Sequence, residues 1–104
     1  MITVTFTESG RKLSLRIKGH AGYAEIGNDI VCSSASILAY TLASIVASED
    51  DVEHNIDLTD GDATIECECK SKETYIEVAK AYYYTLVGYT ILAQNYPQYV
   101  RLEA

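Results

Sequence analysis

The sequence has few residues that interrupt regular structure and few cations. Its 104 residues include one proline, six glycines and no tryptophan, so we expect few long irregular connections. Fifteen Asp and Glu against eight Lys and Arg leave a formal net charge of −7. Nucleic-acid binding draws most of its affinity from clustered cations, so direct nucleic-acid binding is not expected. Such an acidic chain suits a neutral or basic partner better.

Disulfides and targeting segments are also not indicated. Three cysteines is an odd number, and two of them, Cys67 and Cys69, are separated by a single residue. This pattern does not suggest a disulfide framework. The N-terminus, Met1-Ile2-Thr3-Val4, enters an alternating pattern at once and lacks the basic and apolar blocks of a signal peptide. We therefore expect a cytoplasmic protein.

One segment approaches the length of a membrane-spanning helix. Residues 30–48 carry no formal charge, but several are Ser or Thr, and the flanking residues include Asp29 and Glu49. Spanning helices usually have Lys or Arg on the cytoplasmic side. A helix buried in a protein core explains the same composition, so no membrane association is expected.

Hydrophobic periodicity predicts two hairpins, two helices and a final strand. Alternation over residues 2–17, with turn residues at 8–11, predicts one hairpin, and residues 51–69 predict another that turns at Asp60-Gly61. Residues 30–48 predict a helix, and a second helix starts after Ser71 and ends before Pro97. A short strand is expected at 99–102. The order β-β-α-β-β-α-β indicates one α+β domain over residues 1–104, with the helices on one or both faces of a mainly antiparallel sheet.

Both helices are rich in residues that pack. The first carries alanines every four residues, and its apolar residues lead us to expect both faces to be covered. These alanines are Ala35, Ala39, Ala43 and Ala47. The second helix is expected to turn its inner face to the core through Val78, Ala79, Tyr82, Leu86 and Tyr89. Its tyrosines supply more aromatic surface than one small core needs, so part of that surface is expected at an interface.

The irregular stretch from Gly19 to Asp29, together with the start of the helix that follows, holds the candidate chemistry. His20 follows a strand, and Cys32 starts the first helix, where the helix terminus favours a thiolate and free N–H groups suit an oxyanion. An imidazole within reach can take the thiol proton. Cys32 could instead be an inert packing residue, and that interpretation stays open. The role of Asp29 is also open, since it either caps the helix or orients His20.

A set of short motifs in this region resembles a known family. Gly19-His20-Ala21, Gly27, Asp29-Ile30-Val31-Cys32 and Ser36 are similar to the signature of the ribosomal-processing cysteine proteases, the Prp family. The resemblance implies that His20 and Cys32 form a catalytic dyad without cofactor or metal, and that Ser36 supports it. It also implies a homodimer. After the cysteine, family members usually carry Ala or Gly, whereas this chain has Ser33-Ser34.

The same resemblance implies a substrate. Family members remove a short N-terminal extension from a large-subunit ribosomal protein, cutting after an aromatic pair with lysines just downstream, which suits an acidic enzyme. The loop bearing Gly19, Gly22 and Gly27 is expected to bind substrate as a mobile wall that orders over the peptide. Two alternatives are a non-catalytic dimeric module that binds a basic ribosomal-protein tail and a thiol redox sensor.

The remaining candidates favour structural roles. Cys67 and Cys69 share one strand face without a second cysteine pair, so packing explains them better than a metal does. His54 alternates with Val52 and Ile56 and is expected to be a half-buried strand residue. The acidic residues from Glu49 to Asp62 lack the ligand spacing of a calcium loop.

Overall fold

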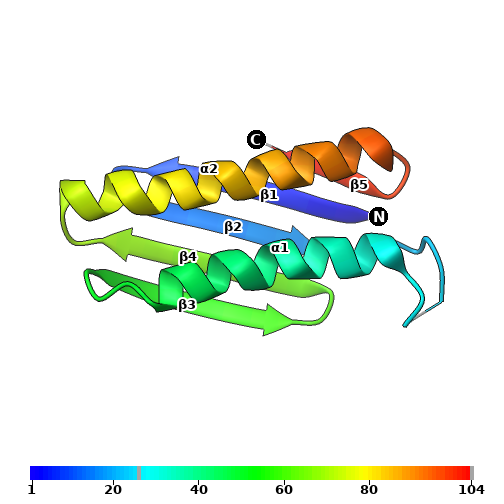
Figure 1. Cartoon of the computed structure of the whole chain (residues 1–104), viewed down its shortest axis with the longest axis horizontal. Helices are drawn as coiled ribbons and strands as arrows, with labels where there is room; N and C mark the ends of the chain where they lie inside the picture. The colour runs from blue at the N-terminus through cyan, green and yellow to red at the C-terminus, as the bar shows by residue number, and fades with distance from the viewer. Residues whose placement is uncertain (26, 104) are drawn as a thin grey trace.

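A computed structural model describes residues 1–25 and 27–103. It contains the seven elements expected, in the expected order (Figure 1). The strands and helices are β1 (Ile2–Ser9), β2 (Lys12–Lys18), α1 (Ile30–Ala47), β3 (Val52–Thr59), β4 (Asp62–Cys69), α2 (Lys72–Asn95) and β5 (Val100–Glu103). The α+β prediction is confirmed, and the predicted boundaries differ from these by one or a few residues.

The strands form one sheet in the order β3-β4-β2-β1-β5. All neighbours are antiparallel except β1 and β5, which are parallel. In the centre of the sheet Leu15 lies opposite Phe6 on one side and Ile65 on the other. Because paired residues point to the same face, this register gathers the alternating apolar side chains on one side of the sheet.

Both helices cover that one face and run antiparallel to each other (Figure 1). The opposite face carries the polar residues of the alternation and is open to solvent. There Arg16 pairs with Asp62 through two bonds of 3.0 Å. Of the two arrangements left open by the sequence, the helices therefore adopt the one-sided one, as period-two strands with one polar face require.

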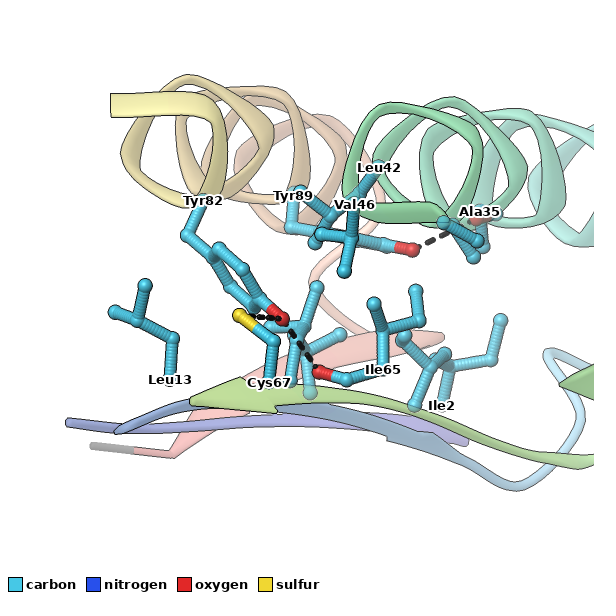
Figure 2. Packing of buried hydrophobic residues seen from close by; sticks show 14 of the residues in the cluster. Ile2, Leu13, Ala35, Leu42, Val46, Ile65, Cys67, Tyr82 and Tyr89 are labelled. Atoms are coloured by element: carbon cyan, nitrogen blue, oxygen red, sulfur yellow. Dashed lines mark hydrogen bonds between the residues drawn. The ribbon is translucent and has the colours of Figure 1, made fainter. Parts of the chain in front are cut away.

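Two tyrosines of α2 fill the space between the layers (Figure 2). Tyr82 donates to the carbonyl of Ile65 at 2.9 Å, and Tyr89 donates to the carbonyl of Ala35 at 2.8 Å. Neither ring is exposed to solvent. Burial raises the pKa of both phenols, so they stay neutral donors, and each ties α2 to another element by a satisfied polar group.

The helices approach closely along part of α1. A Cβ at Gly88 would lie 2.6 Å from Leu38 Cδ2, so the absence of a side chain there allows the contact. Ala35, Ala39 and Ala43 are buried, but Ala47 is exposed. The predicted inner face of α2 is buried except for Leu86, which is half-buried.

The expectation that both faces of α1 are covered is wrong within one chain. Ile37 is 62% exposed, Tyr40 50% and Ile45 42%. The sheet contacts only one side of the helix, and α2 lies along a second, so one apolar stripe stays uncovered. By length and composition α1 could cross a membrane. Helices of soluble proteins pass the same test, and α1 packs against α2 and the sheet along part of its surface.

Candidate active site

His20 lies just beyond the end of β2. The Gly19 N–H donates to the carbonyl of Gly61 at 2.8 Å, which fixes this chain segment beside the turn between β3 and β4. Gly19 has a φ of +100°, and a Cβ there would collide with the backbone of Met1. Glycine is therefore required where β2 ends, and the imidazole that follows is exposed at this end of the sheet.

Cys32 lies in the first turn of α1 and is half-buried. It is not sealed in the core, in contrast to Cys67 and Cys69, which are both buried. Burial raises the pKa of the Cys67 thiol and, with Cys67 beside it, raises that of Cys69 to about 12. Those two thiols are therefore protonated and inert at neutral pH, which leaves Cys32 as the accessible thiol of the chain.

His20 and Cys32 border the same hollows. One, of about 420 Å³, lies between the 19–29 loop and the start of α1; a smaller one, of about 70 Å³, lies between α1 and the β3–β4 turn. Both are lined by His20, Cys32, Ser36 and Asp60. We call these two hollows, which share these four lining residues, the depression; His20 and Cys32 both line it.

A larger hollow of about 480 Å³ lies elsewhere, around Lys12, His54 and Glu68. The one thiol in its lining, Cys67, is buried, so we assign the cysteine chemistry to the depression beside Cys32. His54 is exposed there, not half-buried as expected, because β3 is an edge strand. Within residues 1–25 and 27–103 no cluster of His, Cys, Asp or Glu could hold a metal ion.

Asp29 is buried and accepts four backbone hydrogen bonds. Its Oδ1 accepts from the N–H groups of Val31 (3.0 Å) and Cys32 (2.9 Å), and Oδ2 accepts from Tyr23 (3.0 Å) and Ala24 (3.3 Å). Burial alone raises the pKa of this carboxyl, but the four N–H bonds outweigh it, and the net pKa is lowered. Both oxygens are engaged with backbone, so the structure has Asp29 as the helix cap and not as a partner of His20.

This cap changes the expected electrostatics of the site. The N–H groups of Val31 and Cys32 bond the Asp29 side chain, and the Ser33 N–H bonds the Asp29 carbonyl at 3.0 Å. These helix-end donors are therefore not available for an oxyanion, contrary to the expectation from the sequence. The ionised carboxylate also offsets the positive charge of the helix terminus beside Cys32.

The loop before Asp29 is attached to the body of the protein at one aromatic residue. The Tyr23 ring lies edge-on to Tyr96 and Tyr99, with centroid distances of 5.5 and 5.2 Å. Gly22 and Gly27 have positive φ and nothing within 4 Å of an added Cβ, so their backbone shape, not crowding, favours glycine. Together Tyr23 and Asp29 hold the loop along one side of the depression.

Comparison with known proteins identifies the family. The model of the cysteine protease Prp family matches residues 1–101. The chain belongs to the cysteine protease Prp family. Its fold is similar to that of the essential ribosomal processing protease Prp from S. aureus in complex with a covalently linked product peptide, with a TM-score of 0.80 and 24% identity over 99% of this chain and 98% of that one.

Other solved structures agree with this fold. SMU.848 from Streptococcus mutans is 30% identical, with a TM-score of 0.70 over 99% of this chain and 92% of that one. The S. aureus Prp in complex with a substrate peptide gives a TM-score of 0.73 and 23% identity over 99% and 98% of the two chains. A search of curated proteins found no match.

Membership of the Prp family confirms the resemblance seen in the motifs and the prediction of a cysteine protease. The catalytic assignment of His20 and Cys32 and the supporting role of Ser36 stay predictions. Ser36 is exposed and lies one turn after Cys32 on the same side of α1.

Sequence reasoning missed the β3–β4 turn as part of this Prp site. Thr59, Asp60 and Gly61 line the small hollow with His20 and Cys32. Asp60-Gly61 is visible in the sequence as a turn, but the pairing of β4 with β2 is needed to bring it to His20. No local signal in the sequence carries that information.

Proposed function

We propose that this cysteine protease removes a short N-terminal extension from a large-subunit ribosomal protein during ribosome assembly, in the cytoplasm. The observation that carries the proposal is the shared depression that His20 and Cys32 line with Ser36 and Asp60. The S. aureus relative is described as a ribosomal processing protease and was solved with peptides bound, which supports a peptide substrate of that class here.

The chemistry follows from the two side chains. The Cys32 thiol gives its proton to the His20 imidazole, and its sulfur attacks the scissile carbonyl carbon. The imidazolium returns the proton to the leaving amine as the C–N bond breaks, leaving a thioester on Cys32. His20 then takes a proton from water as its oxygen attacks the thioester carbon; the C–S bond breaks, the carboxyl product leaves, and the Cys32 thiolate regains its proton from His20. No metal or cofactor is needed in this sequence of steps.

Charge favours a basic substrate. The net charge is −7, and Asp60 borders both hollows at the site. A peptide with lysines just beyond the scissile bond is attracted to this surface, mainly through a faster association rate. Raising the salt concentration is therefore expected to raise KM for such a peptide while leaving kcat nearly constant.

The direct test is cleavage of a synthetic peptide that spans the extension of a large-subunit ribosomal protein, with products identified by mass spectrometry. We expect the wild type to cut one bond after an aromatic pair, Cys32→Ala to be inactive, and His20→Ala to lose about 10²–10⁴-fold in kcat. Cys69→Ala and His54→Ala are matched controls, since both residues lie outside the depression. Intact peptide with the wild type, or unchanged activity in Cys32→Ala, contradicts the proposal.

We also propose that the enzyme is a homodimer joined through the outer surface of its helices. This surface is apolar and uncovered: Tyr84 is 71% exposed, Ile37 62% and Val87 57%. A hollow of about 370 Å³ runs between α1 and α2 beside Tyr84. Large exposed apolar residues on neighbouring helices are typical of protein interfaces, and a second copy of the chain offers the same surface.

Light scattering after size exclusion tests the dimer. Wild-type protein is expected at twice the chain mass, and Tyr84→Glu at the chain mass, because the substitution buries a charge in the contact. Thr7→Glu, on the exposed polar face of the sheet, is the matched control and is expected to stay dimeric. A monomeric wild type at micromolar concentration overturns this proposal.

A further inference from the structure

The turn between β3 and β4 lies directly against the imidazole of His20. A Cβ built on Gly61 would be 2.6 Å from His20 Nε2, closer than real Cβ atoms approach other atoms, and 3.0 Å from Cε1. The ring therefore occupies the space that any side chain at position 61 would need. The ring atom nearest to this Cβ position is Nε2, one of the two imidazole nitrogens that can bind a proton.

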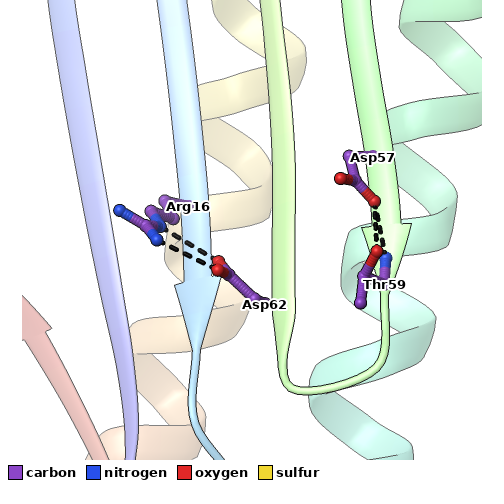
Figure 3. A network of polar contacts seen from close by, with 4 residues as sticks. All are labelled: Arg16, Asp57, Thr59 and Asp62. Atoms are coloured by element: carbon purple, nitrogen blue, oxygen red, sulfur yellow. Dashed lines mark hydrogen bonds and ion pairs between the residues drawn. The ribbon is translucent and has the colours of Figure 1, made fainter.

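The turn is held in place from both sides (Figure 3). Before it, Asp57 Oδ1 accepts from the Thr59 N–H at 3.0 Å and from the Thr59 hydroxyl at 2.5 Å. After it, the Asp62 carboxylate forms a bidentate ion pair with the guanidinium of Arg16 on β2. The Gly19 N–H also bonds the Gly61 carbonyl, so the strand end that carries His20 and the turn that it touches are joined directly.

From this contact we infer that Gly61 is a positioning residue for the reaction: its missing side chain lets the turn fix the His20 ring at the orientation needed to exchange a proton with Cys32. The inference rests on the proposed dyad. It assigns a role to a residue far from both catalytic motifs in the sequence, and it acts through His20 and not through contact with the substrate.

Gly61 is at a positive φ of +79°, so a substitution there has a backbone cost as well as a contact with the ring. The chain offers a control for this cost. Gly10, in the β1–β2 turn, has a φ of +59° and nothing within 4 Å of an added Cβ. Asparagine tolerates this backbone region better than other residues with a side chain. Gly10→Asn therefore reproduces the backbone change without touching an imidazole.

The experiment compares Gly61→Asn, Gly10→Asn, His20→Ala and the double variant Gly61→Asn/His20→Ala. Cys32 alkylation by iodoacetamide is measured from pH 5 to 9, and peptide cleavage is measured in parallel. For Gly61→Asn we expect the pH profile of Cys32 alkylation to shift toward that of His20→Ala. We also expect kcat to fall by about 10²-fold with a smaller change in KM, since displacing a catalytic group by about 1 Å costs about that much. Gly10→Asn should match the wild type within about 2-fold.

The double variant separates positioning from general damage. If Gly61 acts through His20, adding Gly61→Asn to His20→Ala changes neither profile nor rate further. The inference is overturned if Gly61→Asn lowers the cleavage rate equally in the wild type and in His20→Ala. It is also overturned if the alkylation profile of Gly61→Asn is like that of Gly10→Asn. Should Gly61→Asn not fold, proton NMR of the wild type decides: a nuclear Overhauser contact between the His20 ring and the Gly61 α-protons is expected, and its absence contradicts the inference.

The proposed protease function and the positioning role of Gly61 would be contradicted by different results. A wild type that cleaves no ribosomal-protein peptide refutes the proposed substrate, but the alkylation profiles still test Gly61. A wild type that cleaves the peptide, with Gly61→Asn equally active, keeps the proposed function and removes only the positioning role.

Discussion

Replacing Asp29 tests how one buried carboxylate supports both the helix and the loop of the site. Asp29→Ala removes two bonds at the start of α1 and two in the loop. Loss of a helix cap costs about 1 kcal/mol, and each loop bond about 0.5–1.5 kcal/mol. The free energy of unfolding should therefore fall by about 2–4 kcal/mol, which lowers Tm by roughly 10–20 °C in a domain of this size.

Asp29→Asn separates the two roles. Its single amide oxygen can keep the bonds to Val31 and Cys32, but the NH₂ group cannot accept from Tyr23 and Ala24. We expect a loss of about 1–2 kcal/mol, between wild type and Asp29→Ala. Urea unfolding followed by circular dichroism at pH 7 measures both variants. A loss below about 0.5 kcal/mol for Asp29→Ala would refute the reasoning.

The pH dependence provides a second measurement. The folded pKa of Asp29 is lowered from 3.8, so the unfolded chain binds the proton more readily. The ionised carboxylate thus contributes its full stability above about pH 4, and this contribution is lost as the pH falls through the lower folded value. The stability difference between wild type and Asp29→Asn should be constant from pH 5 to 7 and shrink below about pH 4. A difference that persists unchanged to pH 2.5 contradicts the assignment.

Two further predictions concern aromatic residues. Tyr89→Phe removes the buried bond to the Ala35 carbonyl and should cost about 0.5–1.5 kcal/mol in urea unfolding. Tyr23→Ala removes the ring contacts to Tyr96 and Tyr99 and should raise KM for the peptide several-fold with little loss of global stability, because the loop must then be ordered by the substrate. An unchanged KM in that variant indicates that the attachment at Tyr23 has no part in binding.

Much of the fold could be predicted because its signals are local. Alternation defines the strands, and Ser71 and Pro97 bracket α2, where the side chain of Ser71 accepts from the Thr74 N–H at 3.2 Å. The exposure of Ile37 could not be predicted in the same way. Hydrophobic residues around a helix indicate that it is covered, but not whether the cover comes from its own chain.

In the candidate active site, too, the features with local signals could be predicted and those that depend on distant contacts could not. His20 and Cys32 are recognisable from short motifs, and both line one depression. The engagement of the Cys32 N–H by Asp29 depends on a side-chain orientation that spacing alone does not give. The contact of His20 with Gly61 depends on strand pairing between segments distant in the sequence. The sequence thus predicts the reactive residues, but not the contacts with Asp29 and Gly61 that position them.

All parts of the reactive centre gather at one end of an elongated molecule whose longest extent is 42 Å. β2 leads from the Gly10 turn to His20, so that turn marks the other end of the sheet. Exposed hairpin tips with open space around them tolerate added residues. A fluorophore or affinity peptide inserted between Gly10 and Arg11 should therefore report on the working enzyme without obstructing it.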